Sequence, residues 1–494
     1  MGAPSLASLV PVGLAALPLA LSIGCPSLDA FRCQEAQECD LAGGGACEAD
    51  GRCSYPADDC DSGRRYAGAR DVFGECTPGP SSSSATDDAS GSGASTGAAP
   101  VCGNGIVEEG EACDELDDVD GDGCNVDCVE SGTPGWGESY DHAGGDDNAF
   151  GLAIADDGRF VVVGSVTDQS GDQDAFVQLR GPSGEIRWTH VMANEGGEGI
   201  DRTEQAFFDG EGGIVACGVT LDARTGLPQG WIEGLTEDGE PTWSVVLAEP
   251  GGSTLRDCEP LGDGTFLVVG TSGPADGDSG LLGRYEIDGT RAWQRLHAEP
   301  AYTPCQLTSG AIDADGTLVI GGRRRIDGAW LSIVAGYTPA GELAWETPPG
   351  GINGLVQECF SVASGNGGVY AMGRVFREVA GFDGWIGQYV DGMLSPWSIE
   401  STPATGIEEF HDLVALPGGD LVIAGSQDGE GHDIMVLRYD SSFELRWLQP
   451  HVGDGHENDK AWDVGLLPDG DLLAVGYEST ATQGANVWIQ RFAP

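Results

Sequence analysis

The sequence predicts an all-β protein: a seven-bladed β-propeller of four-stranded antiparallel blades, preceded by small disulfide-rich modules. Three observations predict this fold. Tryptophan recurs at intervals of 50 to 55 residues, a Gly-rich turn followed by a short apolar run returns seven times, and no segment has a helical pattern. A fixed period of this length indicates repeated supersecondary units that pack side by side. The periodic tryptophans are Trp136, Trp188, Trp243, Trp293, Trp345, Trp397 and Trp447.

Each repeat reads as four short strands. A strand such as 150–154 precedes a turn, and the second strand is the apolar run that follows it, as in Asp157 to Gly164. Asp-Gly and Gly-Gly pairs supply the positive φ angles of tight hairpin turns, and β-branched residues suit a buried strand. A third strand centres on an apolar pair such as Phe176-Val177, and the fourth carries the tryptophan. Four antiparallel strands per repeat are typical of a propeller blade.

The tryptophans favour a packing role. One large ring per blade is typical of contact between neighbouring blades, whereas a ligand-stacking cage needs rings that point into a channel. The fourth strands, such as 183–188 and 340–345, resemble the tryptophan-docking segments of quinoprotein-like propellers. Over residues 136–494 the repeats also resemble the short β-propeller repeats of bacterial surface proteins. Quinoprotein dehydrogenases use adjacent cysteines near the cofactor, and this chain has no such pair, which argues against a quinone redox role.

The limits of the repeats predict how the ring closes. The seventh unit ends at Pro494 after its third strand, and Trp136 precedes the first full unit with no third strand before it. We therefore expect residues 136–140 to complete the last blade of a propeller that spans 136–494. Such a closure removes two open sheet edges.

The first residues predict export. Residues 1–24 are uncharged with an apolar stretch from Leu9 to Ile23, which is typical of a secretory signal peptide, although the basic first region is missing. The segment that ends at Gly24-Cys25 resembles a bacterial lipoprotein cleavage site, with Ser22 where that pattern usually has Leu. The resemblance implies lipidation of Cys25 and attachment to a membrane without a span. An ordinary signal peptide is the alternative.

Fifteen cysteines also favour an oxidising compartment. Besides Cys25, six of them crowd residues 25–76, a cysteine-rich module too small for a core of its own, and the sequence does not decide how they pair. Residues 77–100 are rich in Ser, Gly, Ala and Thr, which predicts a flexible linker. The six cysteines are Cys33, Cys39, Cys47, Cys53, Cys60 and Cys76.

A second small module occupies residues 101–130. Its glycines, acidic residues and cysteines, from Cys102-Gly-Asn-Gly through Cys113-Asp to Cys124-Asn-Val-Asp-Cys128, resemble the myxobacterial cysteine-rich repeat family over residues 102–128. The resemblance implies two disulfides and an extracellular setting. It implies no catalytic chemistry.

A calcium loop is one interpretation of the acidic residues in this module. Asp118, Asp120 and Asp122 have the spacing of the first half of such a loop. Val129 stands where an EF-hand has a bidentate Glu, so the loop is not an EF-hand. A solvated acidic turn is the alternative. Calcium is the only cofactor that the sequence suggests.

Four cysteines lie in the propeller repeats. Cys217 is expected in the second strand of blade two, and Cys258, Cys305 and Cys359 in the first strands of blades three, four and five. Pairing between neighbouring blades predicts two disulfides, 217 with 258 and 305 with 359. Each would add roughly 4 kcal/mol under the chain-entropy model. Buried free thiols are the alternative.

Charge limits the classes of partner. The chain has 80 acidic and 23 basic residues, a net charge of −57, so nucleic acid and anionic lipid surfaces would be repelled. Cations, basic proteins and neutral glycans fit this charge. The one basic cluster, Arg323-Arg324-Arg325, is expected in the loop after the second strand of blade four. It predicts either a docking patch for a carboxylate or phosphate, or a solvated loop.

No catalytic constellation is visible in the sequence. The seven His are scattered, a phosphate-loop motif is missing, and the one Gly-x-Ser-x-Gly match, at 93–97, falls in the linker and not in a nucleophile elbow. A propeller ligand would bind around the channel, where loops enter the first strands. The charged residues of these loops are candidates for a ligand face, or are water-exposed turn residues. The candidates are Asp146, Asp201, Arg256, Glu358, Glu409 and Asp459.

The sequence therefore favours an exported, lipid-anchored protein of the outer membrane or cell surface, whose propeller binds a protein or a glycan. Without the anchor it would be periplasmic or secreted. The alternative is an extracellular enzyme, a glycosidase or lyase, that uses acidic residues around the channel. Three or more buried carboxylates that converge in one pocket would favour the enzyme, and a flat, wet channel mouth would favour binding. A purely structural envelope protein is a third hypothesis.

Overall fold

The computed structural model divides the chain into two units, residues 1–97 and 98–494. In the first unit, β1 (Ala46–Cys47), β2 (Cys53–Pro56) and β3 (Arg64–Tyr66) form one small antiparallel sheet. The expected signal peptide, lipidation site and linker lie outside the described residues, as does the rest of the module at 25–76. The second unit is described over 102–494 without 105–106, 108–110, 116–118, 143, 169–170, 193–200, 275–277, 298–303, 348–356, 366, 378–380, 401–407, 429–431, 454–457 and 481–483.

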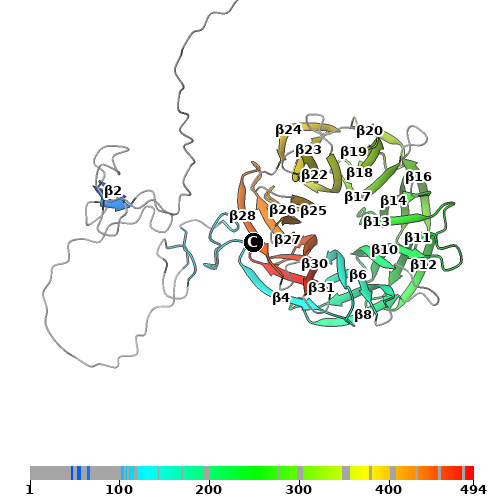
Figure 1. Ribbon diagram of the computed structural model, residues 1–494, viewed down its shortest axis with the longest axis horizontal. Coiled ribbons are helices and arrows are strands. Elements are labelled where there is room, and N and C mark those ends of the chain that lie inside the picture. The colour runs from blue at the N-terminus through cyan, green and yellow to red at the C-terminus, as the bar shows by residue number, and fades with distance from the viewer. Residues whose placement is uncertain are drawn as a thin grey trace, which may run out of the picture. The chain divides into compact units, whose positions relative to one another are not determined.

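In the second unit seven four-stranded antiparallel sheets form a ring (Figure 1). The expected seven-bladed propeller is confirmed. The innermost strands are β5 (Asn148–Ile154), β9 (Arg202–Phe208), β13 (Ser253–Pro260), β17 (Cys305–Ile312), β21 (Gln357–Gly365), β25 (Glu408–Ala415) and β29 (Lys460–Leu466). The second strands are β6 (Phe160–Thr167), β10 (Ile214–Leu221), β14 (Thr265–Ser272), β18 (Leu318–Ile326), β22 (Gly368–Arg377), β26 (Leu421–Asp428) and β30 (Leu472–Thr480).

The third strands continue each sheet outward, and the fourth strands form the rim. The third strands are β7 (Gln173–Arg180), β11 (Pro228–Leu235), β15 (Ser279–Glu286), β19 (Ala329–Tyr337), β23 (Gly381–Val390), β27 (His432–Tyr439) and β31 (Gly484–Phe492). The rim strands are β4 (Pro134–Tyr140), β8 (Ile186–Met192), β12 (Pro241–Leu247), β16 (Arg291–His297), β20 (Leu343–Glu346), β24 (Met393–Glu400) and β28 (Leu445–His451). Within the described residues no helix is long and apolar enough to cross a membrane.

A strand that precedes the first blade closes the ring. β4 pairs antiparallel with β31, so that Glu138 lies opposite Ile489 and Ser139 opposite Trp488. The last blade therefore consists of β29, β30, β31 and β4. Because β4 supplies its fourth strand, no blade of the ring is left with three.

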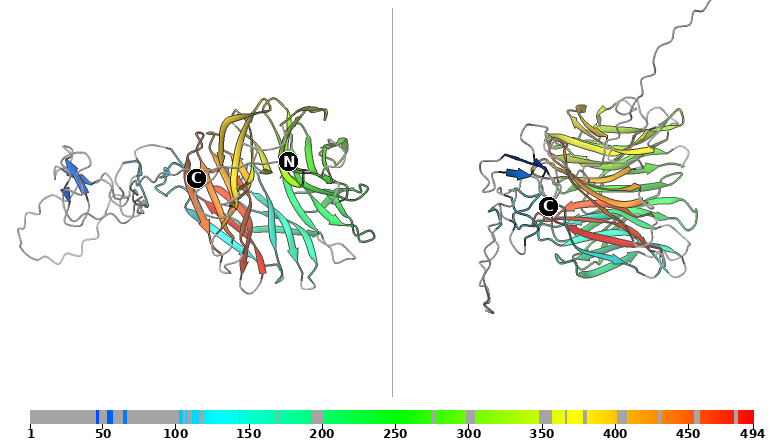
Figure 2. Two further views of the ribbon diagram at one scale, coloured as in Figure 1. Left: turned by 45° about the horizontal axis from the view of Figure 1, so that its top comes forward. Right: turned by 60° about the vertical axis from the view of Figure 1, so that its left-hand side comes forward.

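The core lies between neighbouring blades, which stand side by side around the channel (Figure 2). Middle strands are almost fully buried: Val162 of β6 packs toward one neighbouring sheet and Val161 toward the other. Rim strands such as β8 alternate between exposed and half-buried residues. The β-branched runs read from the sequence therefore form the buried middle of each blade.

The periodic tryptophans pack between blades. Trp188 of β8 donates from Nε1 to the carbonyl oxygen of Glu237 in the next blade at 2.8 Å, and Trp293 donates in the same way to Pro339 at 3.0 Å. A Cβ added to Gly239 would lie 2.8 Å from the Trp188 ring, so the turn glycine gives the indole its place. The repeated tryptophan and the repeated turn glycine thus belong to one contact.

Every innermost strand carries a β-bulge at the same place. Opposite the bulge stands the glycine that ends the apolar run of the second strand. A Cβ on Gly164 would lie 1.8 Å from the carbonyl oxygen of Asn148, and one on Gly218 would lie 2.0 Å from that of Arg202. The glycine is therefore required because the inner strand approaches too closely for a side chain.

Two disulfides hold the small module that precedes β4. Cys102 is bonded to Cys128, and Cys113 is bonded to Cys124. These bonds place disulfide-bonded cysteines in the N-terminal region. Membership of the myxobacterial repeat family stays a prediction.

The propeller cysteines form one of the two expected bonds. Cys217 of β10 is bonded to Cys258 of β13 in the next blade. Cys305 and Cys359 are buried free thiols, so the expected bond between them is wrong. Cys305 packs in the apolar cluster between blades three and four, and Cys359 packs in the cluster between blades four and five. The sheet of blade four therefore separates the two sulfurs.

The structure gives the acidic turn of the module a local role. Asp120 accepts the backbone N–H of Val126 at 2.8 Å, and Asp118 lies outside the described residues. Among the described residues, the one cluster of His, Cys, Asp or Glu atoms close enough to share an ion contains the disulfide-bonded residues 102 and 128. Calcium binding by Asp118, Asp120 and Asp122 stays a prediction.

Candidate ligand-binding site

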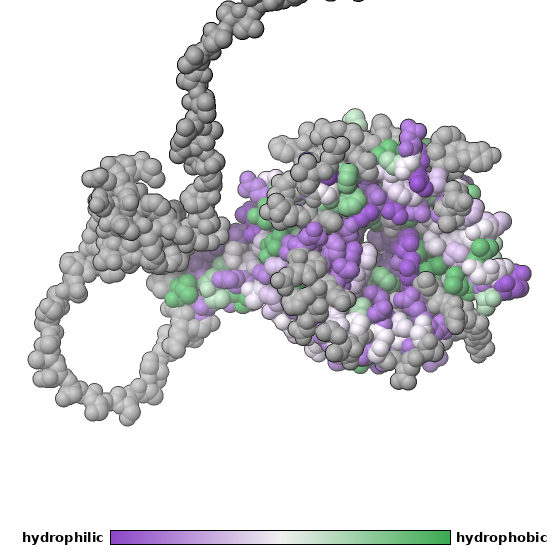
Figure 3. All heavy atoms as spheres, viewed as in Figure 1, coloured by the Kyte–Doolittle hydropathy of each residue, from purple (hydrophilic) through white to green (hydrophobic). Residues whose placement is uncertain are grey.

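A cavity of about 840 Å³ lies at one mouth of the central channel. Residues from all seven innermost strands line it, near the ends at which these strands begin. Figure 3 shows a hollow in the centre of the ring with hydrophilic residues around it. The volume falls in the range of pockets that hold small molecules.

The bulges of the innermost strands build the wall of the cavity. A bulge leaves one residue without a partner in the ladder and re-aims its side chain. Since the bulge recurs at one level in every blade, the seven bulge residues form a ring, and all seven line the cavity. They are Phe150, Glu204, Arg256, Thr308, Phe360, His411 and Trp462.

The residues that follow the bulges form the floor and join different blades. Asp463 accepts hydrogen bonds from the backbone N–H of Leu152 at 2.8 Å and from Nε2 of Gln205 at 2.9 Å. Ser361 donates from Oγ to Asp412 at 2.7 Å. Each carboxyl therefore links its own blade to a neighbour as well as facing the cavity.

Burial raises the pKa of the floor carboxyls. It raises the pKa of Asp257 to about 6, although the backbone N–H of Gly310 donates to that carboxyl at 2.8 Å. Burial also raises the pKa values of Asp412 and Asp463, and the charge of Asp463 adds to the rise at Asp412. Further along β13, burial raises the pKa of Glu259 to about 8, where it lines a second cavity of about 550 Å³ at the other end of the channel. Near neutral pH, Glu259 is therefore largely protonated.

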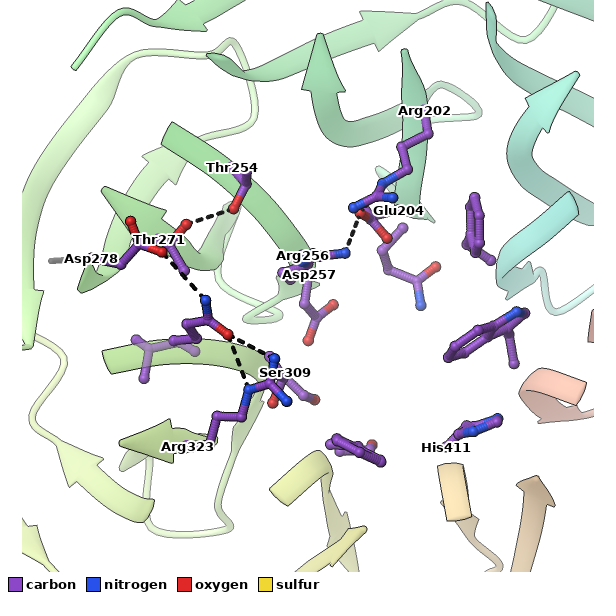
Figure 4. Close-up of a pocket in the computed structure, with 18 of the residues that line it drawn as sticks. Arg202, Glu204, Thr254, Arg256, Asp257, Thr271, Asp278, Ser309, Arg323 and His411 are labelled. Carbon is purple, nitrogen blue, oxygen red and sulfur yellow. Dashed lines mark hydrogen bonds and ion pairs between the residues drawn. The ribbon is translucent and has the colours of Figure 1, made fainter. Parts of the chain in front are cut away.

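Two arginines share one carboxylate on blades two and three. Arg256 donates from Nη1 to Glu204 at 2.7 Å, and Arg202 donates from Nε to the same oxygen at 2.5 Å (Figure 4). The Glu204 side chain is 9% exposed, whereas that of Arg256 is 41% exposed. The first arc of the wall, defined by these three residues, thus carries one more positive than negative charge.

Three cations share two carboxylates on blades four to seven. Arg323 and Arg374 both donate to Glu358, at 2.7 and 3.1 Å. Arg374 also pairs with Glu409, to which Lys460 donates from Nζ at 3.0 Å. Burial opposes ionisation of Glu409, but a histidine hydrogen bond and the two cations outweigh it and lower the pKa of that carboxyl. This second arc, defined by these five residues, also carries one surplus positive charge.

The cavity is unusual in a chain of this composition. Five of the 23 basic residues line it, although the net charge of the chain is −57. Lys460 is the only lysine in the sequence. Six acidic residues also line the cavity, so it is much richer in cations than the rest of the chain without being basic overall.

Aromatic rings share the level of these charges. Trp462 stacks on His411 with ring centroids 4.3 Å apart, and Phe150 meets Trp462 edge-on at 6.0 Å. The guanidinium of Arg374 lies 5.3 Å from the ring of Phe360. His411 is buried, while the three other rings are half-buried at the cavity wall.

The structure brings only part of the expected ligand face together. Arg256 and Glu409 line the cavity. Glu358 is buried behind the wall, where it holds Arg323 and Arg374. A ligand in the cavity would contact Arg256 and Glu409 directly, whereas Glu358 would act on it through Arg323 and Arg374.

The other three candidates hold backbone on the same face. Asp201 accepts the N–H of Leu221 at 3.0 Å, and Asp459 accepts the N–H of Ser479 at 2.6 Å. Asp146 accepts the N–H of Ala485 at 3.0 Å. None of the three lines the cavity among the described residues.

The arginine cluster lies in a strand, which corrects its expected place in a loop. β18 runs to Ile326, and the three side chains have different surroundings. Arg323 lines the cavity, Arg324 is buried beside His297 and Glu346 at 2.8 and 3.0 Å, and Arg325 is exposed. The cluster is therefore neither a single docking patch nor a solvated loop.

Glu204, Arg374, Lys460 and Trp462 were not expected at the site from the sequence. The bulge residues have a signal, since Glu204 lies 14 residues before Gly218, and the same spacing separates bulge and glycine in every blade but the fifth, where it is 13. Alignment of the repeats on that glycine would have found the ring.

Comparison with known proteins concerns the fold. No protein-family model matches the chain, and no curated protein sequence matches it. Among solved structures, a quinohemoprotein alcohol dehydrogenase from Pseudomonas putida HK5 is 11% identical, with a TM-score of 0.38, over 68% of this chain and 65% of that one. The β-propeller domain of the Trilobed protease from Pyrococcus furiosus is 8% identical (TM-score 0.42, 70% and 93%). Chaetomium thermophilum Sqt1 is 13% identical (TM-score 0.42, 71% and 98%).

Proposed function

We propose that the chain is an exported, lipid-anchored surface protein whose propeller binds a glycan or a protein segment in the cavity at the channel mouth. The observation that carries the proposal is the bulge ring, in which all seven blades direct one residue into a single cavity. The ring combines charged, polar and aromatic side chains. Convergent polar groups beside apolar faces are what small-ligand pockets use for orientation and affinity.

Export has separate support. The disulfide bonds indicate an oxidising, extracellular environment. The lipid anchor rests on the pattern of residues 1–25. Growth of producing cells with a labelled fatty acid tests it: wild-type protein should carry the label, and Cys25→Ser should not. Equal labelling of both chains would contradict the anchor.

The binding proposal is tested with the full chain immobilised and exposed to labelled glycans and proteins of the cell envelope. Trp462→Ala removes the largest ring of the bulge ring and should reduce retention about tenfold or more. Leu445→Ala on β28 is the control, because it truncates an apolar side chain that is 46% exposed at the rim. Equal retention by Trp462→Ala and Leu445→Ala would contradict binding in the cavity.

Catalysis is the second candidate, and the floor of the cavity favours it. Asp257, Asp412 and Asp463 converge there, and burial raises the pKa of all three, that of Asp257 to about 6, which is the direction a general acid needs. Binding is preferred because each carboxyl is already hydrogen-bonded across blades. Release of new reducing ends from polysaccharides by the wild type, with loss in Asp463→Asn, would establish a glycosidase or lyase.

A further inference from the structure

We infer that the ligand of the cavity is a short acidic saccharide, one whose sugar rings carry carboxylates. The inference rests on the proposed binding function and names its ligand class. Three features carry it: a surplus of cations in each arc of the wall, aromatic rings at the same level, and the contrast between the cavity and the rest of the chain.

The first arc has one positive charge more than it has negative charges. Arg202 and Arg256 both donate to Glu204, so one carboxylate serves two guanidinium groups. Arg256 is the more exposed of the two and makes one side-chain ion pair, which uses one of its five N–H groups. A ligand carboxylate would accept from the rest in the fork geometry that arginine favours.

The second arc has the same imbalance. Arg323, Arg374 and Lys460 are paired with two carboxylates, and both carboxylates lie deeper than the cations that hold them. Glu358 is 8% and Glu409 10% exposed, against 20 to 27% for the three cations. The positive groups therefore face the cavity in front of their partners.

The carboxyls of the floor offset the positive charge of the two arcs to an extent that depends on pH. Asp257, Asp412 and Asp463 lie below the arcs, and burial holds their pKa values above the ordinary range. Asp278 also lines the cavity. Uptake of a proton by Asp257, whose pKa is about 6, makes the cavity less negative at mildly acidic pH and so strengthens the effect of the positive arcs. An acidic saccharide should therefore bind more tightly at pH 5.5 than at pH 8.

Aromatic rings favour a sugar over a simple carboxylate. Phe150, Phe360 and Trp462 occupy three of the seven bulge positions, in the same ring as Arg256. Their half-buried faces are apolar surfaces on which the C–H face of a pyranose packs, while ring hydroxyls reach Thr308 and Gln306 at the wall. A uronic acid combines an apolar ring face with a carboxylate, which matches the aromatic rings and cations of the cavity wall.

The charge of the whole chain limits the ligand to a short one. A net charge of −57 repels a long polyanion before it reaches the mouth. A cavity of about 840 Å³ has room for a few sugar rings. The structure therefore suits a short oligosaccharide or a chain end.

Calorimetry with the full chain tests the ligand class. The probes are digalacturonate, the matching neutral galactose disaccharide and the dipeptide Glu-Glu. Digalacturonate should bind at least tenfold more tightly than either of the others. Arg256→Gln removes the surplus of the first arc and should weaken digalacturonate about tenfold, whereas Glu204→Gln doubles that surplus and should strengthen it. Arg295→Gln, an exposed arginine on the rim strand β16, should change neither.

Lys460 supplies a second readout, because it is the only side-chain amine in the chain. Bound digalacturonate should protect Lys460 from an amine-reactive label, as measured by mass spectrometry of the peptide that contains it.

The proposed ligand class would be wrong if the neutral disaccharide or Glu-Glu bound as tightly as digalacturonate. It would also be wrong if Arg256→Gln and Glu204→Gln shifted the affinity in the same direction. Either result would leave the binding function standing. No binding and no protection by any probe would also overturn the acidic saccharide. The binding function would fall with it only if Trp462→Ala retained envelope material as the wild type does.

Discussion

Individual carboxyls in the channel are held in surroundings that favour their protonated form. Asp257 and Glu259 lie two residues apart on β13, and burial raises the pKa of each; the charge of Asp257 adds to the rise at Glu259 because like charges repel. A raised pKa in the folded state means that folding takes up protons between the unfolded and the folded pKa. Stability contributed by such a group is therefore present at low pH and is lost as pH rises through that interval.

Glu259→Gln should remove much of this pH dependence. The pKa of Glu259 is raised from 4.5 to about 8, so the wild type should lose stability as pH rises from about 5 to 8. The melting temperature should fall by roughly 2–4 °C for each kcal/mol lost. Thermal unfolding between pH 5 and 8.5 measures it, with the exposed Glu286→Gln as the control. A wild-type stability that rises over this interval would contradict the raised pKa.

The sequence predicted the hydrogen-bond and ion-pair partners of individual side chains less well than it predicted the fold. Trp188 and Gly164 could be interpreted because each has one role that returns from blade to blade among the described residues. The partners of Arg256 and Asp459 depend on which neighbouring strand lies opposite them. The residues of a short β-strand do not indicate which strand that neighbour is. Arg323 was misplaced for a local reason: β18 extends further than the apolar run that marks it.

At the scale of elements, the bulge is the feature that links fold and site. It recurs because the second strand ends its apolar run with glycine, which lets the inner strand come close enough to kink. The same kink turns Phe150 or Trp462 into the cavity. The pattern that predicted the strands therefore also positions the candidate site, although the sequence did not reveal this second consequence.

Gly164→Ala should be costly, and a second glycine supplies the control. A Cβ at Gly164 would overlap the carbonyl oxygen of Asn148 at 1.8 Å, so the blade must distort and stability should fall by about 3 kcal/mol. Gly418 lies in a turn with nothing near its added Cβ, and Gly418→Ala should be neutral or slightly stabilising. Urea unfolding compares them. Equal effects of the two substitutions would contradict the role of the bulge glycine.

The disulfide between blades two and three gives a second test at this scale. Replacement of Cys217 and Cys258 by Ser opens a bond that spans 41 residues and should cost roughly 4 kcal/mol. Unfolding in urea with and without reductant measures it, since reductant should remove the difference between the two chains. Cys305→Ala removes no cross-link and should show no such dependence on reductant. A difference that persisted under reductant would indicate lost packing instead.

At the scale of the whole molecule, the net negative charge and the cations at the channel mouth act at different ranges. The net charge of −57 acts over a screening length of about 8 Å in physiological salt, whereas the arcs act at contact. The chain should therefore repel bulky polyanions and yet present cations to a ligand small enough to enter. The sequence predicted the first property from composition, while the second needed the fold to gather residues from blades two to seven.

Closure of the ring should decide cooperativity. A chain that begins at residue 141 lacks β4 and leaves β31 with an open edge, so it should unfold at lower urea and associate through that edge. A chain that begins at residue 98 keeps β4 and should unfold as the full protein does. Urea titration and light scattering measure both. A monomer of unchanged stability that begins at residue 141 would contradict the role of β4.

The pairing of β4 with β31 also sets the order of events while the protein is made. β4 is the first propeller strand to leave the ribosome, and its partner β31 is the last of the propeller strands to be made. Six blades have all four of their strands before the seventh does, yet the ring stays open until β31 has been made. If the chain is exported as it emerges, β4 pairs with β31 on the far side of the membrane, where the disulfides also form.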